Sequence, residues 1–113
     1  MEYYMYLEGI PMIQWASRLY IGDKLMKRKD KTIASINNRR LTYDVYCIAI
    51  ASHPGNLFDI MNANELLFPH YQRTEVKIVG LAKGREEAIS LVQDMIMELY
   101  QNTGSFNVRD YFL

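Results

Sequence analysis

The sequence predicts a single α/β domain over residues 1–113, a small two-layer sandwich with helices packed on a sheet of three to five strands. Three features predict this class: an amphipathic helical pattern over 85–101, apolar runs over 43–51 and 75–82, and a strand–helix–strand–helix order. The class becomes α+β if the sheet is antiparallel. A length of 113 residues suits one domain, and the chain has no linker, repeat or low-complexity stretch.

The first 41 residues allow several structures. Residues 2–7 are rich in tyrosine and typical of a strand. Apolar residues between 17 and 39 fit one helix, or two shorter helical pieces that meet at residues 29–31, where charges interrupt the apolar face. Residues 14–21 are alternatively a third strand.

The two apolar runs are typical of interior strands covered on both faces. Residues 56–67 show helical spacing, with Asn56 as a candidate N-cap, so a helix is expected to connect the runs over 43–51 and 75–82. Such a crossover predicts that the two strands are neighbours and parallel. If residues 57–61 form a strand instead, the sheet is antiparallel there.

The helix over 85–101 has the clearest boundaries. Glu86 and Glu87 fall in its first turn, where carboxylates suit the positive end of the helix dipole, and Gly104 is placed for a left-handed C-terminal cap. The tail, residues 106–113, predicts a short edge strand or an arm docked on the core.

Two loops predict a site for a small anion. The turn over 80–86 combines glycine with Lys83, Gly84 and Arg85 at the start of a helix, where free backbone N–H groups attract phosphate or carboxylate. If the strands are parallel, the 52–56 loop with His53 lies at the same sheet edge. The alternatives are a plain loop with Gly84 as N-cap and a solvated histidine, because the phosphate-binding motifs are absent.

A basic stretch over residues 24–40 predicts a possible nucleic-acid surface. Aromatic residues near it (Trp15, Tyr20 and Tyr43) are candidates for stacking on bases. The basic residues proposed for contact are Lys27, Arg28, Lys29 and Lys31. The alternative is a solvated helix face.

The charge distribution favours that alternative. The chain has no net charge, but residues 1–41 carry a net charge of +4 and residues 42–113 a net charge of −4. A balanced total argues against a protein whose whole surface binds nucleic acid, and the two halves are able to attract each other.

The remaining chemistry-bearing residues give weaker patterns. Cys47 is the only cysteine and lies in an apolar run, so it is interpreted as a core residue. His53 and His70, with Asp59 and Glu65 between them, lack the spacing of a metal site. No cofactor and no metal are therefore expected, and no arrangement of residues indicates an enzyme.

The first hypothesis for function is a non-catalytic partner-binding or self-associating protein. Nine tyrosines and seven methionines, several at the chain ends, are residue types favoured at protein interfaces. A small anionic-ligand binding domain that uses the 52–56 and 80–86 loops comes second, and nucleic-acid binding through residues 24–40 third. A homo-oligomer in the cytoplasm, with no role for a membrane, is the expected setting, because no secretory signal or membrane-spanning stretch is visible.

Overall fold

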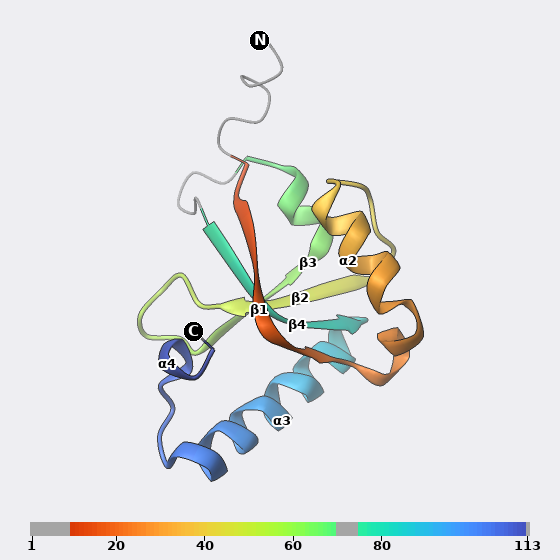
Figure 1. Ribbon diagram of the computed structural model, residues 1–113. Helices are drawn as coiled ribbons and strands as arrows, with labels where there is room; N and C mark the ends of the chain where they lie inside the picture. The colour runs from red at the N-terminus through yellow and green to blue at the C-terminus, as the bar shows by residue number, and fades with distance from the viewer. Residues whose placement is uncertain (1–9, 70–74, 113) are drawn as a thin grey trace.

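The structure, a computed structural model, describes residues 10–69 and 75–112. It confirms an α/β domain with a four-stranded mixed sheet (Figure 1). The strands are β1 (Met12–Ile21), β2 (Val45–Ile50), β3 (Phe58–Asn62) and β4 (Glu75–Lys83). The helical elements are η1 (Asp23–Arg28), α2 (Lys29–Asn37), η2 (Ala63–Leu67), α3 (Arg85–Thr103) and α4 (Val108–Tyr111).

The strand order is β1-β4-β2-β3, so β2 and β4 are interior neighbours as the apolar runs predict. Their direction differs from the prediction: β2 is antiparallel to both β4 and β3, and only β1 and β4 run parallel. Val45 therefore pairs with Lys83, and the end of β2 that leads to His53 lies at the opposite end of the sheet from Lys83. The predicted shared edge for the two loops is wrong.

The cause is the segment predicted as a crossover helix. Its middle forms β3, a short edge strand that turns back along β2 and pairs Ile60 with Ile48. A strand that returns in this way needs only the tight loop at 51–57, whereas a parallel pair needs a long crossover. The helical part is confined to η2, which Asn62 and Glu65 begin with a reciprocal capping box.

In the first part of the chain, the alternative of a strand over 14–21 is confirmed by β1, which forms the other edge of the sheet. One helix from 17 to 39 is therefore wrong. Two helical pieces follow β1 instead, and η1 passes into α2 at Arg28, close to the predicted junction. The strand-like residues 2–7 lie outside the described residues.

Helices cover both faces of the sheet (Figure 1). The long helix α3 packs on one face, where Met95 and Leu99 are fully buried against Ile48 of β2. It runs two residues beyond the predicted end and stops at Gly104, whose φ of 72° confirms the predicted left-handed cap. The shorter η1, α2 and η2 lie on the other face, where Leu25 and Ile36 join Cys47 in a second apolar cluster.

The C-terminal tail is a docked arm with one helical turn, α4, rather than an edge strand. Phe112 is 7% exposed and packs edge-to-face against Tyr20 and Phe58. Arg109 donates to the carbonyl oxygen of Ala51 at 2.8 Å, which ties the arm to the end of β2. Among residues 10–69 and 75–112, no helix is both long and apolar enough to cross a membrane.

Candidate anion-binding site

A cavity of about 360 Å³ opens between the η1–α2 segment, the loop that precedes β2 and the end of β4. Its walls combine basic side chains, hydroxyl groups and two exposed apolar side chains. The lining residues that carry the chemistry are Lys24, Arg28, Lys31, Thr32, Ser35, Leu41, Thr42, Tyr43 and Lys83. The cavity therefore brings together residues from the two predicted sites, Lys83 from one and Arg28 and Lys31 from the other.

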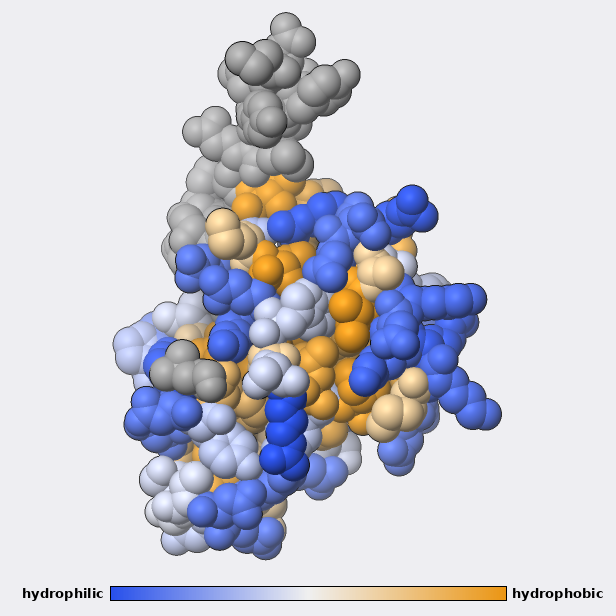
Figure 2. All heavy atoms as spheres, in the orientation of Figure 1, coloured by the Kyte–Doolittle hydropathy of each residue, from blue (hydrophilic) through white to orange (hydrophobic). Residues whose placement is uncertain are grey.

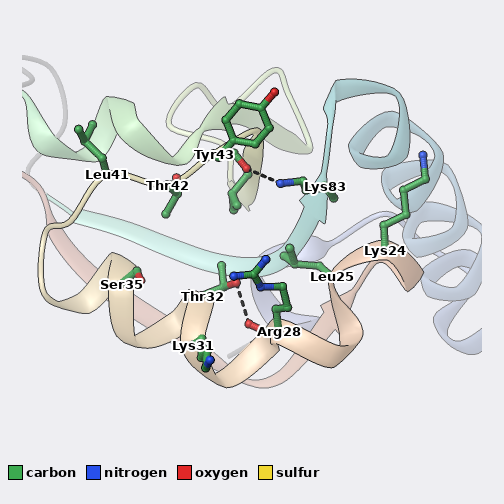
Figure 3. Close-up of a pocket in the computed structure, with 11 residues that line it drawn as sticks. Lys24, Leu25, Arg28, Lys31, Thr32, Ser35, Leu41, Thr42, Tyr43 and Lys83 are labelled. Carbon is green, nitrogen blue, oxygen red and sulfur yellow. Dashed lines mark hydrogen bonds between the residues drawn. The ribbon is translucent and has the colours of Figure 1, made fainter.

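The two cations nearest the centre come from opposite walls. Figure 3 shows the Arg28 and Lys83 side chains directed into the space between η1–α2 and β4, with Lys24 standing to one side. Lys31 lies on the rim and points away from that space. Lys83 is held in place, because its Nζ donates to the Tyr43 carbonyl oxygen at 2.7 Å and lies 4.6 Å from the centre of the Tyr43 ring.

The positive charge of the cavity is not neutralised from within. No carboxylate is among the residues that line it in the described ranges 10–69 and 75–112. Lys24, Arg28 and Lys31 form no ion pair inside the described parts of the chain, so the attraction between the basic and acidic halves does not take the form of ion pairs at these residues. Figure 2 shows hydrophilic side chains gathered over the α2 side of the molecule. Several unpaired cations around a concave surface attract anions, because their potentials add.

A single carboxylate, that of Glu87, fixes two walls of the cavity. One oxygen accepts the backbone N–H of Lys83 at 2.8 Å, and the other accepts the backbone N–H of Lys24 at 3.0 Å. Gly22 makes this approach possible, since a Cβ at residue 22 would overlap the Glu87 carboxylate. The 80–86 junction was predicted to offer free N–H groups to a ligand, but Glu87 already occupies the Lys83 N–H. The site uses the Lys83 side chain instead.

The other residues predicted for the small-anion site are separated from Lys83 or take structural roles. His53 lies in the exposed 52–56 loop, where its Nδ1 accepts the Gly55 N–H at 3.1 Å. Gly84 is the N-cap of α3, as the alternative interpretation had it, with a φ of 82°. Arg85 is not in the basic cavity and lines a separate hollow along β3. His53, Gly84 and Arg85 therefore do not converge on one anion with Lys83.

The predicted nucleic-acid surface is divided in the same way. Lys27 and Lys29 are exposed but lie outside the cavity that Arg28 and Lys31 line. Arg39 belongs to the fold: it donates to the carbonyl oxygens of Pro11 at 2.6 Å and of Leu66 at 3.3 Å, and burial lowers its pKa.

The fold also places the three candidate stacking residues in different surroundings. Trp15 is half-buried and donates to the Asn37 side chain at 2.7 Å. Tyr20 lies on the opposite sheet face in the α3 cluster. Of the three, Tyr43 remains beside the basic cavity and is 82% exposed.

Cys47 is completely buried in the core, as predicted, and burial raises the pKa of its thiol to about 12, with a smaller contribution from the negative charge of Glu65. A protonated, inaccessible thiol is a poor nucleophile and a poor metal ligand. His70 lies outside the described residues, so the pairing of His53 with His70 stays a hypothesis. Elsewhere, residues 10–69 and 75–112 contain no cluster of three potential metal ligands.

Five of the lining residues that carry the chemistry were not named as site residues from the sequence: Lys24, Thr32, Ser35, Leu41 and Thr42. Lys24 lies at the turn after β1, and its place depends on the Glu87 contact 63 residues away. Leu41 is an isolated apolar residue in a connecting segment. In the sequence, the local signal that points to this surface is a leucine and a tyrosine two residues apart, directly after Arg39 and Arg40.

Comparisons with protein-family models, with curated proteins and with solved structures found no match to this chain.

Proposed function

We propose that this protein is a small-ligand binding domain that holds an anionic group, of the phosphate type, in the basic cavity between η1–α2 and β4. The observation that carries the proposal is the pair of cations, Arg28 and Lys83, directed from opposite walls into one hollow, which no carboxylate of the described residues lines. Arginine and lysine donors on two sides match the several acceptor oxygens of a phosphate group.

The cavity is ready for an anion without rearrangement of its backbone. Lys83 uses one of its three N–H donors on the Tyr43 carbonyl oxygen, which leaves two for a ligand. Within the described residues the Arg28 guanidinium donates no hydrogen bond to the fold, and the Arg28 backbone oxygen accepts one from the Thr32 hydroxyl at 2.7 Å. Lys83 is already held in position, which reduces the entropy that its side chain loses on binding.

Inorganic pyrophosphate is the probe for the test, titrated calorimetrically at constant ionic strength with sodium chloride as the reference. Arg28→Ala is expected to weaken binding by about tenfold, or about 1.4 kcal/mol, the lower range for a charge-assisted hydrogen bond at a partly exposed site. Lys27→Ala is the matched control, because it removes the same charge from the neighbouring position outside the cavity.

Two results would contradict the proposal. One is the absence of pyrophosphate binding by the wild-type protein at low ionic strength. The other is an equal loss of affinity in Arg28→Ala and Lys27→Ala, which is expected of a diffuse cationic surface and not of a cavity. The Arg28 side chain forms no hydrogen bond or ion pair within the described parts of the chain, so Arg28→Ala is expected to fold.

Self-association or binding of a protein partner, the first hypothesis from the sequence, stays a prediction. The argument from the apolar C-terminal residues is weaker, because Val108 and Phe112 are buried in the protein's own core and are not exposed to a partner. Deletion of residues 111–113 is therefore a test of folding rather than of assembly. Sedimentation of the full chain over a range of concentrations measures self-association directly, and a monomer throughout would contradict that hypothesis.

A further inference from the structure

An apolar shelf borders the basic cavity on one side. It consists of Leu41 and Tyr43, which are 76% and 82% exposed. Both residues line the cavity, and Figure 3 shows their side chains directed to the same side of the connecting segment between α2 and β2. Two large side chains exposed to solvent next to four cations form a surface with two parts. One part attracts anionic groups, and the other contacts apolar or planar groups.

The shelf is rigidly mounted by the residue between its two members. The Thr42 backbone N–H and hydroxyl both donate to the Asn64 side-chain oxygen, at 2.8 and 3.0 Å, and the Asn64 amide donates back to the Thr42 carbonyl oxygen at 3.0 Å. These three hydrogen bonds tie the connecting segment to η2 at the residue between Leu41 and Tyr43. The exposure of the shelf follows from the fold.

Tyr43 connects the shelf to the charged part of the cavity. The Lys83 ammonium lies 4.6 Å from the centre of the Tyr43 ring, a cation–π distance, while most of the ring surface stays open to solvent. A tyrosine ring oriented in this way is a platform on which a planar ring stacks. The same ammonium has donors available for an anion, so one ligand is able to contact both.

We infer that the ligand of this cavity is a single nucleotide, with its phosphates between Arg28 and Lys83 and its base stacked on Tyr43. This inference rests on the proposed anion-binding function and names the class of ligand. A cavity of about 360 Å³ lies at the small end of the range for small-molecule sites, roughly 300–1,000 Å³, which suits one nucleotide.

The surroundings of the cavity favour a single nucleotide over a single-stranded nucleic acid. Strand binding uses several aromatic platforms along a basic groove. Trp15 is hydrogen-bonded to Asn37, and Tyr20 lies on the other sheet face. Of the three aromatic residues near the basic stretch, all of which the structure describes, Tyr43 is the one whose ring is exposed beside the cavity. A single exposed tyrosine ring stacks with one base.

The experiment compares inorganic pyrophosphate, a nucleoside diphosphate (ADP and UDP in turn) and the corresponding nucleoside, by calorimetry at constant ionic strength. The nucleotides are expected to bind more tightly than pyrophosphate by roughly 5- to 150-fold, the range for stacking of one base. Tyr43→Ala is expected to remove this advantage, so that pyrophosphate and the nucleotides bind the variant about equally tightly, while the backbone oxygen of residue 43 still accepts from Lys83. Tyr43→Phe keeps the ring and is expected to keep the advantage.

The outcomes separate the two proposals. Equal affinity for pyrophosphate and both nucleotides, or an equal loss of affinity for all of them in Tyr43→Ala, overturns the nucleotide inference and leaves the anion site standing. Failure of every probe to bind overturns both. Single-stranded oligonucleotides that bind more tightly with increasing length, and less tightly after Lys27→Ala and Lys29→Ala, overturn the single-nucleotide inference in favour of a strand.

Discussion

Replacement of Glu87 tests how the fold constructs the cavity. Its carboxylate accepts two backbone N–H groups, from Lys83 at 2.8 Å and Lys24 at 3.0 Å, and so joins the end of β4 to the turn after β1. Glu87→Ala leaves both donors without this partner. A hydrogen bond to a charged group contributes about 1.5–3 kcal/mol when buried, and the partial exposure here reduces this to about 1 kcal/mol each.

The expected loss is therefore about 2 kcal/mol of the free energy of unfolding, or about 8 °C in melting temperature for a domain of this size. Urea unfolding followed by circular dichroism measures the first quantity. Glu86→Ala is the matched control, because it also removes a carboxylate from the first turn of α3 but none of the hydrogen bonds. A difference between the two variants below about 0.5 kcal/mol would refute this account of Glu87.

The same contact predicts a coupling with Gly22. A Cβ at residue 22 would overlap the Glu87 carboxylate, so Gly22→Ala is expected to destabilise the wild-type protein and to cost much less in the Glu87→Ala background. Additive effects in the double variant would show that the two residues do not meet in this way.

Three further predictions address the core, the thiol and the separation of the two loops. Phe112→Ala is expected to lower the free energy of unfolding by about 3 kcal/mol, the low end of the range for a buried phenylalanine. A loss below about 1 kcal/mol in urea unfolding would contradict the docking of the arm on the core. Burial raises the pKa of the Cys47 thiol to about 12, so the folded state keeps a proton that the unfolded chain releases from about pH 9. The free energy of unfolding is therefore expected to fall between pH 9 and 12 and to fall less steeply in Cys47→Ala, and equal slopes would contradict this. His53→Ala is expected to leave pyrophosphate affinity unchanged, because His53 and Lys83 lie at opposite ends of β2; a large loss in calorimetry would restore a shared site.

The parts of the fold that were predicted correctly carry their signal locally. The helix α3 shows a 3.6-residue apolar period with acidic residues at its start and Gly104 at its end. The interior strands β2 and β4 are continuous apolar runs. Such runs show that both faces are buried, but they are the same in parallel and antiparallel strands, so the direction of β2 was not determined by them.

The error at β3 has a physical cause. Leu57, Ile60 and Met61 match helical spacing. The five-residue strand β3 forms because it pairs with β2, and this pairing produces no pattern in the sequence of residues 57–62 themselves. The capping box of Asn62 and Glu65 was the available signal, because it marks the start of η2 six residues after the predicted cap.

The candidate site was predicted in fragments. Lys83, Arg28 and Lys31 were each named from the sequence, but for two different sites. Their assembly depends on the pairing of β4 with β2 and on the contact of Glu87 with Lys24 at the start of η1, both of which join residues far apart in the chain. Spacing along the sequence contains no record of such contacts.

The most direct test of the central claim is a titration of the isotope-labelled protein with pyrophosphate, followed through its backbone amide resonances. Binding in the basic cavity predicts the largest shifts at Arg28, Thr42, Tyr43 and Lys83, with those of residues 52–56 unchanged. Uniform small shifts over every exposed basic residue, with Lys27 and Lys29 equal to Arg28, would contradict a built anion site.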